Sequence, residues 1–105
     1  MRDLEFIING QMIKKDPACS FNNIVAGSSN FYNAKFNFGY DWDGFACVAA
    51  FEANGKIQYV PIKNNQCLVP NTVINEREYL ISVIGMKGAT MINTNKVKIT
   101  QTIFT

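Results

Sequence analysis

The chain has 105 residues, of which 48% are hydrophobic and 17% charged, and its ten basic and eight acidic residues give a net charge of +2. This length predicts one domain over residues 1–105, and the weak, scattered positive charge argues against nucleic-acid binding, which depends on clustered contacts to phosphates. The absence of histidine excludes Ser-His and Cys-His catalytic pairs, and no apolar run reaches the ~18 residues of a membrane span.

Alternation of apolar and polar residues, which places every second side chain on the same face, predicts several strands in the first third of the chain. These strands are 3–8, 11–15, 22–27 and 31–38. Asn9-Gly10 joins the first two as a hairpin turn, because both residues tolerate positive φ, and Pro17 interrupts the pattern after the second strand. In the fourth strand we expect the following side chains to face the core: Tyr32, Ala34, Phe36 and Phe38.

The middle of the chain continues with apolar segments that are separated by turns. Residues 45–51 are apolar on both faces, which indicates a central strand or a strand that a partner covers. A second Asn-Gly turn leads into the strand 56–62. Pro61 cannot donate to a sheet ladder, so this strand is expected at an edge or a bulge. A tight turn and another short strand follow within 63–70.

The last third of the chain is expected to complete the same all-β pattern. Residues 71–78 fit either one helical turn or a bent crossover between sheets. Residues 79–85 form a buried strand, 86–91 a loop and 95–105 the last strand. We expect seven to eight of these segments to form strands, with turn signals about every ten residues, and this spacing predicts a β-sandwich.

The only tryptophan, Trp42, stands between Asp41 and Asp43 and just before Gly44. One interpretation is a carboxylate pair for Ca²⁺ or acid–base chemistry, but Ca²⁺ takes about six to eight oxygen ligands and only two carboxylates are close in the sequence. We favour the interpretation in which the aspartates cap a turn. Trp42 then packs in the core, and its indole N–H donates to a carbonyl. We expect no catalytic, metal or cofactor site.

The three cysteines, Cys19, Cys47 and Cys67, lie too far apart in the sequence for a structural zinc site, which needs closely spaced ligands. Their odd number, and first residues without an apolar signal sequence, predict synthesis in a reducing cytoplasm. We expect Cys47 and Cys67 to be buried as small hydrophobic residues and all three thiols to be free.

A series of short motifs between about residues 22 and 100 gives the chain a resemblance to a known family. The motifs are Trp42-Asp43-Gly44, Ala49-x-Phe51, Tyr59, Cys67-x-x-Pro70, Ile81-x-Val83-x-Gly85 and Thr94-Asn95. In this order they resemble the immunoglobulin-like sandwich domain in virion proteins of tailed phages that infect Gram-positive bacteria. The resemblance implies an immunoglobulin-like β-sandwich. It also implies five fold anchors: Trp42, Gly44, Phe51, Pro70 and Gly85.

The resemblance implies a structural protein of a phage particle that is not an enzyme, made in the bacterial host cytoplasm and located in the virion. Many such domains precede a coiled coil or a receptor-binding part, whereas this chain stops at Thr105. We therefore expect a capsid decoration or accessory subunit that binds the major capsid protein in many copies. The residues expected to contact the partner are Arg2, Lys14, Lys15, Phe31, Tyr40, Lys87 and Met91.

Two alternatives remain open at this point. The same family includes baseplate and tail subunits, among them fibre adaptors, and the sequence does not separate head from tail. A carbohydrate-binding module is a function of a different class, because sandwiches carry many functions. A module of this kind would need several exposed aromatic side chains in one plane on a sheet face.

Overall fold

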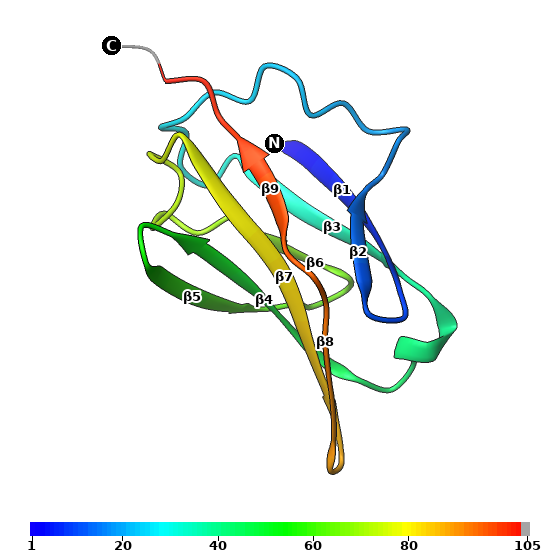
Figure 1. The fold of residues 1–105 in the computed structure, drawn as a ribbon. Helices are drawn as coiled ribbons and strands as arrows, with labels where there is room; N and C mark the ends of the chain where they lie inside the picture. Colours follow the sequence, from blue (N-terminus) through cyan, green and yellow to red (C-terminus); the bar gives the residue numbers. More distant parts are fainter. Residues whose placement is uncertain (104–105) are drawn as a thin grey trace.

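Nine β-strands and one short 3₁₀ helix make up residues 1–103, the part of the chain that the computed structural model describes (Figure 1). The elements are β1 (Arg2–Asn9), β2 (Met12–Lys15), β3 (Tyr32–Phe38), η1 (Tyr40–Trp42), β4 (Ala46–Ala53), β5 (Lys56–Pro61), β6 (Gln66–Leu68), β7 (Glu78–Lys87), β8 (Thr90–Asn93) and β9 (Val97–Thr100). No helix within these residues is long and apolar enough to cross a membrane.

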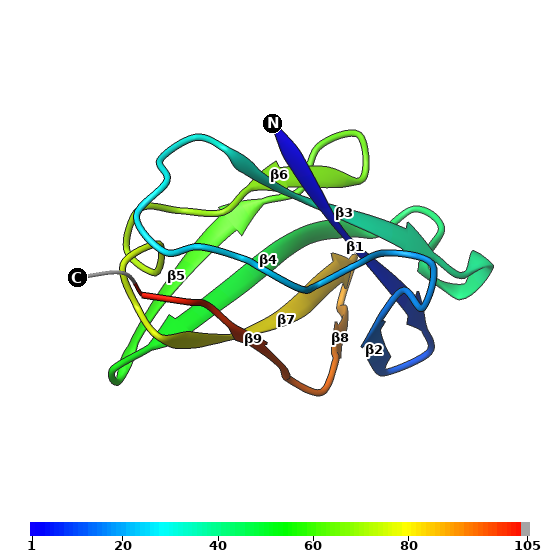
Figure 2. The same ribbon diagram turned by 90° about the horizontal axis from the view of Figure 1, so that it is seen from above.

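The strands form two sheets that pack face to face, which confirms the predicted all-β sandwich (Figure 2). The smaller sheet has the order β2-β1-β3-β6, and the larger has β5-β4-β7, with β8 and β9 both pairing the far side of β7. The order of the larger sheet is that of the GFCC′ sheet in immunoglobulin domains. One pairing departs from the antiparallel sheets of those domains, because β1 and β3 run parallel.

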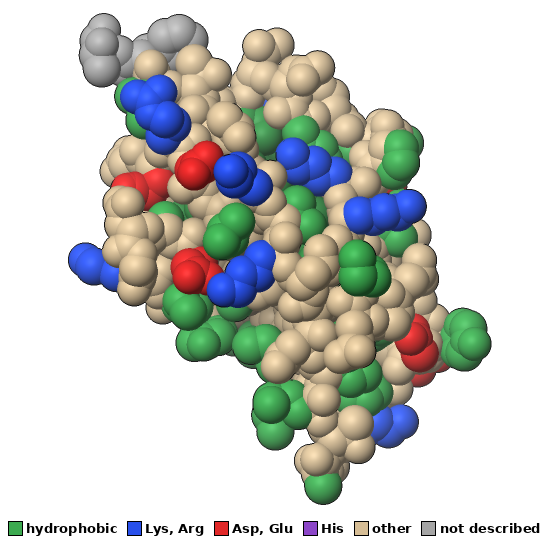
Figure 3. Space-filling view, viewed as in Figure 1, with side chains coloured by type: hydrophobic (Ala, Val, Ile, Leu, Met, Phe, Trp, Pro, Cys, Tyr) green, Lys and Arg blue, Asp and Glu red, His purple; other side chains and the backbone are tan. Residues whose placement is uncertain are grey.

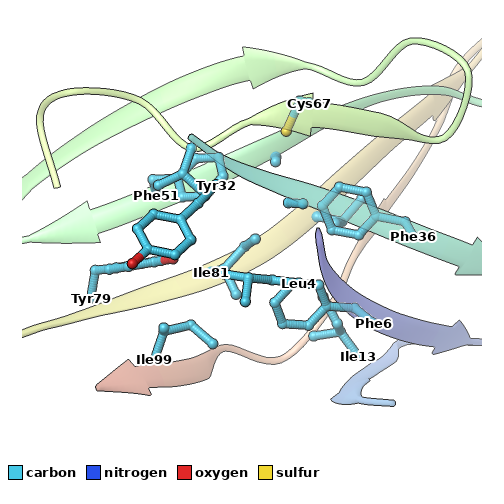
Figure 4. Packing of buried hydrophobic residues seen from close by; sticks show 14 of the residues in the cluster. Leu4, Phe6, Ile13, Tyr32, Phe36, Phe51, Cys67, Tyr79, Ile81 and Ile99 are labelled. Carbon is cyan, nitrogen blue, oxygen red and sulfur yellow. The ribbon is translucent and has the colours of Figure 1, made fainter. Parts of the chain in front are cut away.

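The core lies between the two sheets and is built from the alternate side chains that the sequence pattern predicts. Figure 4 shows Leu4 and Phe6 of β1 pointing toward Ile81 of β7. Phe6 stacks on Phe36 of β3, with 5.7 Å between the ring centres. On the larger sheet, Phe51 is fully buried. Strands β4 and β7 contribute inward side chains along most of their length, so both are central, as their apolar sequences indicate.

Trp42 closes one end of the core. Its side chain is 3% exposed, and its indole Nε1 donates a hydrogen bond of 2.8 Å to the carbonyl of Gly10 in the β1–β2 turn. The ring lies against Gly85 of β7, where any side chain would collide with it. The expected burial of Trp42 and the expected bond from its indole to a carbonyl are therefore both confirmed.

One long side of the sandwich is closed by contacts between the two sheets. The side chain of Asn95 donates to the carbonyl of Ile13 at 3.1 Å and accepts from the Ile13 N–H at 2.7 Å, so it continues the edge of β2 as a strand would. Further along this side, Val25 forms an isolated parallel bridge with Thr102.

Nine strands are present in the described residues rather than the predicted seven to eight, and β8 is a strand that the sequence did not predict. The prediction of a loop at 86–91 is wrong, because β7 continues to Lys87 and β8 begins at Thr90. A tight turn with Gly88 at φ +60° joins them, and the resulting hairpin projects from the body of the molecule (Figure 1). The predicted strand 95–105 is shorter, because β9 covers only Val97–Thr100; residues 104–105 lie outside the described part.

The predicted strand at 22–27 is also wrong, because only Val25 of this segment forms a bridge, the one with Thr102. The hydroxyl of Tyr32 donates to the carbonyl of Val25 at 2.8 Å and accepts from its N–H at 2.9 Å, so a side chain satisfies the groups that a ladder would use. Residues 71–76 form turns between β6 and β7, which matches the bent crossover that was one of two expectations. Gln101 is 2% exposed, and its amide donates to carbonyls of this crossover.

Candidate functional site

The outer surface of the larger sheet is mostly apolar. Its outward side chains alternate with those that enter the core, and the β4–β5, β4–β7 and β7–β8 registers place them side by side. We call this surface the apolar face. Its apolar members are Ala46, Val48, Ala50, Ile57, Tyr59, Pro61, Leu80, Ile84, Met86 and Met91, and the same registers place the polar side chains Glu52, Ser82 and Asn93 among them.

Several members of the apolar face are well exposed. Ile57 is 48% exposed, Tyr59 56%, Met86 54% and Met91 59%. Single exposed hydrophobic residues are normal on soluble proteins, but a continuous apolar patch indicates a site of interaction. In Figure 3, hydrophobic side chains gather below the charged ones, over the region where β4, β5 and the lower part of β7 lie. These side chains can bury apolar area against another protein.

Charged side chains border the apolar face near β9 and at the β4–β5 turn. Lys96 and Glu52 form an ion pair of 2.7 Å, and Lys98 and Glu78 form one of 3.7 Å. Both pairs are partly exposed to solvent, and such pairs contribute little to stability. In both ion pairs, the two partners neutralise each other's charges at this border of the apolar face.

The outer surface of the smaller sheet is polar by contrast. Lys35 of β3 pairs with Asp3 of β1 at 3.5 Å. The amide of Asn33 donates to Asp3 at 3.1 Å and to Gln66 at 3.0 Å, which explains why Asn33 is buried although the alternation predicts it to face outward. The two outer surfaces of the sandwich therefore differ in chemistry, and only that of the larger sheet is suited to an apolar contact.

A groove of about 680 Å³ adjoins the apolar face where β4 begins. Phe38, Phe45 and Ile62 line its inner part, and Asn64 and Asn65 lie at its polar side. The groove continues onto the apolar face, since five members of that face also line it: Ala46, Val48, Pro61, Ile84 and Met86. A side chain that projects from a bound protein could occupy this hollow.

Three of the predicted contact residues are engaged within the chain. The Arg2 guanidinium donates to three carbonyls of the loop that follows β2, those of Ser20, Asn22 and Asn23, at 2.6–3.1 Å. The Lys15 ammonium lies 5.2 Å from the centre of the Phe21 ring.

The third residue, Lys87, is the last residue of β7 and belongs to the hairpin of β7 and β8. Its ammonium is 5.8 Å from the centre of the Phe45 ring, and it donates to the carbonyl of Asp43 at 3.4 Å. The structure thus gives Arg2, Lys15 and Lys87 local roles, and their contact with a partner stays a prediction.

The other four predicted contact residues are exposed but do not lie together. Lys14 is on β2, Phe31 precedes β3, and Tyr40, which is 89% exposed, begins η1. Only Met91 belongs to the apolar face. The exposed aromatic side chains Phe31, Tyr40 and Tyr59 come from three different parts of the chain, and only Tyr59 belongs to the apolar face.

The residues named as fold anchors occupy structural positions. Gly44 has φ +83°, a conformation that glycine adopts without strain, in the turn before β4. Pro70 follows β6 at the start of the crossover, and the N–H of Val73 bonds to its carbonyl. Phe51 and Gly85 face the core from β4 and β7.

The thiols show no sign of activation. Burial raises the pKa of Cys67 to about 12 and also raises the pKa of Cys47. A thiol with a raised pKa is a poor nucleophile near neutral pH, because the thiolate is the reactive form. All three cysteines are free. Within residues 1–103, no group of three or more cysteine or carboxylate side chains is placed to hold a metal ion.

The sequence was also compared with known proteins. No family model matches the chain, and no curated protein matches it.

Proposed function

We propose that this protein is a non-catalytic structural subunit of a tailed-phage particle that binds a neighbouring virion protein through the apolar face. The proposal favours a decoration or accessory subunit bound in many copies to the major capsid protein. One observation supports the binding part of this proposal: the outer surface of the larger sheet is mostly apolar and exposes Ile57, Tyr59, Met86 and Met91, while that of the smaller sheet is mostly polar. The motif resemblance described above supplies the phage context.

The size of the apolar face favours a contact of modest affinity. Complete burial of a large apolar side chain contributes about 1.5–3 kcal/mol, so burial of the exposed half of Ile57, Tyr59, Met86 and Met91 contributes roughly 1 kcal/mol each. Association costs about 4–15 kcal/mol in lost freedom of motion. The remaining contacts must therefore supply the surplus.

The location of the chain tests the phage context. Particles of the phage that encodes the chain should be purified and separated into heads and tails, and the chain should be counted by mass spectrometry against the major capsid protein. We expect many copies in the head fraction. Enrichment in tails would favour the baseplate or tail alternative, and absence from both fractions would refute a structural role in the virion.

A second experiment tests the apolar face. The double variant Met86→Glu, Met91→Glu places two carboxylates opposite each other on exposed positions of the face. Their repulsion lowers folding stability by at most about 1 kcal/mol, but both must be desolvated on binding. The matched control is Lys35→Glu, which changes charge on the smaller sheet. In co-sedimentation with particles that lack the chain, we expect the double variant to bind at least about tenfold more weakly. Equal binding by both variants would rule out the apolar face as the contact.

A further inference from the structure

The edge of β5 is the longest open strand edge of the sandwich. β5 has six residues, whereas the other edge strands β2, β6, β8 and β9 have three or four. Short edge strands protect a protein from pairing with other chains, and so do lysine and proline, which β5 carries only at its two ends, as Lys56 and Pro61. β9 carries Lys98, and β2 is covered by Asn95. The middle of β5, residues 57–60, has no charged side chain.

The hydrogen-bonding groups on the open edge of β5 follow from its register with β4. The Ile62 N–H bonds to the carbonyl of Cys47, so every second residue before Ile62 also bonds to β4. The main-chain groups of Ile57, Tyr59 and Pro61 therefore point away from the sheet. Proline has no N–H, which leaves two outward donors and three outward carbonyls. Within the described residues, no hydrogen bond reaches the main chain of Ile57 or Tyr59 from outside the β4–β5 pair.

We propose that a second copy of this chain occupies this edge, with the two β5 strands antiparallel and a two-fold axis at Gln58. In this register, Ile57 of each copy lies opposite Tyr59 of the other. Each such pair exchanges two main-chain hydrogen bonds, so four bonds form and both outward N–H groups of each β5 strand find acceptors. The two larger sheets become one continuous sheet.

The side chains of β5 favour a second copy as the occupant. Ile57 and Tyr59 form aromatic to β-branched pairs across the strands, a combination that stabilises sheets. Lys56 lies opposite Val60 of the second copy, so no like charges meet. Because Ile57 and Tyr59 also belong to the apolar face, the pairing joins the two apolar faces into one larger surface. The pairing is a property of the chain alone and does not depend on the proposed function.

Cysteine cross-linking tests the register. Gln58 lies on the two-fold axis in a pair without hydrogen bonds, where Cα atoms are about 4.5 Å apart, which a disulfide can span. Under mild oxidation, Gln58→Cys should form a covalent dimer. The matched control is Lys56→Cys, because the two copies of this position are about 13 Å apart along the strands. The wild-type chain controls for its native thiols. No covalent dimer with Gln58→Cys, or equal dimer with Lys56→Cys, would overturn the proposal.

Sedimentation velocity over a range of protein concentrations tests the pairing without a cross-link. The wild-type mass should rise from 11.8 kDa toward twice that value as concentration increases. Tyr59→Pro removes an outward N–H without removing a bond to β4, and we expect it to weaken dimerisation at least tenfold. Tyr59→Leu keeps the N–H and should dimerise. A wild-type chain that stays monomeric at every concentration, or a Tyr59→Pro variant that dimerises as well as Tyr59→Leu, would refute the pairing.

These results are separable from those that test the proposed function. The Met86→Glu, Met91→Glu variant leaves the β5 edge unchanged and should still form the dimer, whether or not it binds particles. Loss of dimer in that variant would contradict pairing through β5 and would point to the apolar face as the contact between copies.

Discussion

Gly85 lies on β7 against the ring of Trp42, and Gly85→Ala tests how tightly this end of the core is packed. A Cβ at this position would lie 2.6 Å from Trp42 Cζ3 and 3.3 Å from Phe45 Cδ2. Carbon atoms in contact normally lie about 3.5–4.0 Å apart, so either the indole or β7 must move. The bond to the Gly10 carbonyl restrains the indole. We therefore expect the free energy of unfolding to fall by about 2 kcal/mol, within the range for overpacked cores.

Urea denaturation followed by circular dichroism measures this change, and a domain of this size should also lose roughly 10 °C in Tm. The steric cause is tested in the Trp42→Phe background, because a smaller ring leaves room for the methyl group. Gly85→Ala should cost less there, and the difference is the coupling energy of the pair. If Gly85→Ala costs less than about 0.5 kcal/mol in the wild type, or costs the same in both backgrounds, the packing argument is wrong.

Three further predictions follow from the structure, and a fourth follows from the proposed function. Trp42→Ala should lower the free energy of unfolding by about 3–5 kcal/mol in a denaturant titration, because it leaves a cavity and an unpaired Gly10 carbonyl. Asn95→Ala should cost about 1–3 kcal/mol and speed hydrogen exchange of the Ile13 amide, which loses its acceptor. Stability should fall as pH rises from about 9 toward 12, because unfolded Cys67 ionises near 9.0 and the buried thiol only near 12; Cys67→Ala should reduce this fall. Phage particles without the chain should assemble but resist heat or osmotic shock less well than complete ones.

Each of these predictions has a result that would contradict it. Trp42→Ala at the stability of the wild type would mean that the indole does not hold the end of the core. Unchanged exchange at Ile13 in Asn95→Ala would mean that another group closes that edge. An equal pH dependence in Cys67→Ala would assign the fall to other groups. Particles that fail to assemble would identify a core component in place of an accessory one.

The parts of the fold that depend on local alternation could be predicted from the sequence. Residues 45–51 are apolar on both faces and residues 79–85 are mostly apolar, and they form the central strands β4 and β7. Pro61 predicted that its strand lies at an edge or a bulge, and β5 is an edge strand. The same pattern in residues 45–51 indicates the apolar face. A strand that is apolar on both sides covers the core with one side, and its other side is available to a covering partner.

Two errors have a different origin, because they involve side chains that form hydrogen bonds outside their own strand. Val25 looks like a strand residue in sequence, but the hydroxyl of Tyr32 takes both of its main-chain groups. Asn33 follows the outward pattern and is nevertheless buried by bonds to two other strands. The seven residues expected to contact a partner are charged or expected to be exposed. These properties do not show which side chains share a surface once the sheets have formed. The seven residues lie on different parts of the fold, and only Met91 belongs to the apolar face.

The first residue of the chain lies on the polar side of the sandwich, because β1 belongs to the smaller sheet. Met1 is 76% exposed and begins the strand layer opposite the apolar face. A peptide or fluorescent protein fused ahead of Met1 would be carried away from the docking surface and out into solvent. The N-terminus is therefore the position of choice for labels, and a subunit attached to a shell through its larger sheet would display such cargo on the particle exterior.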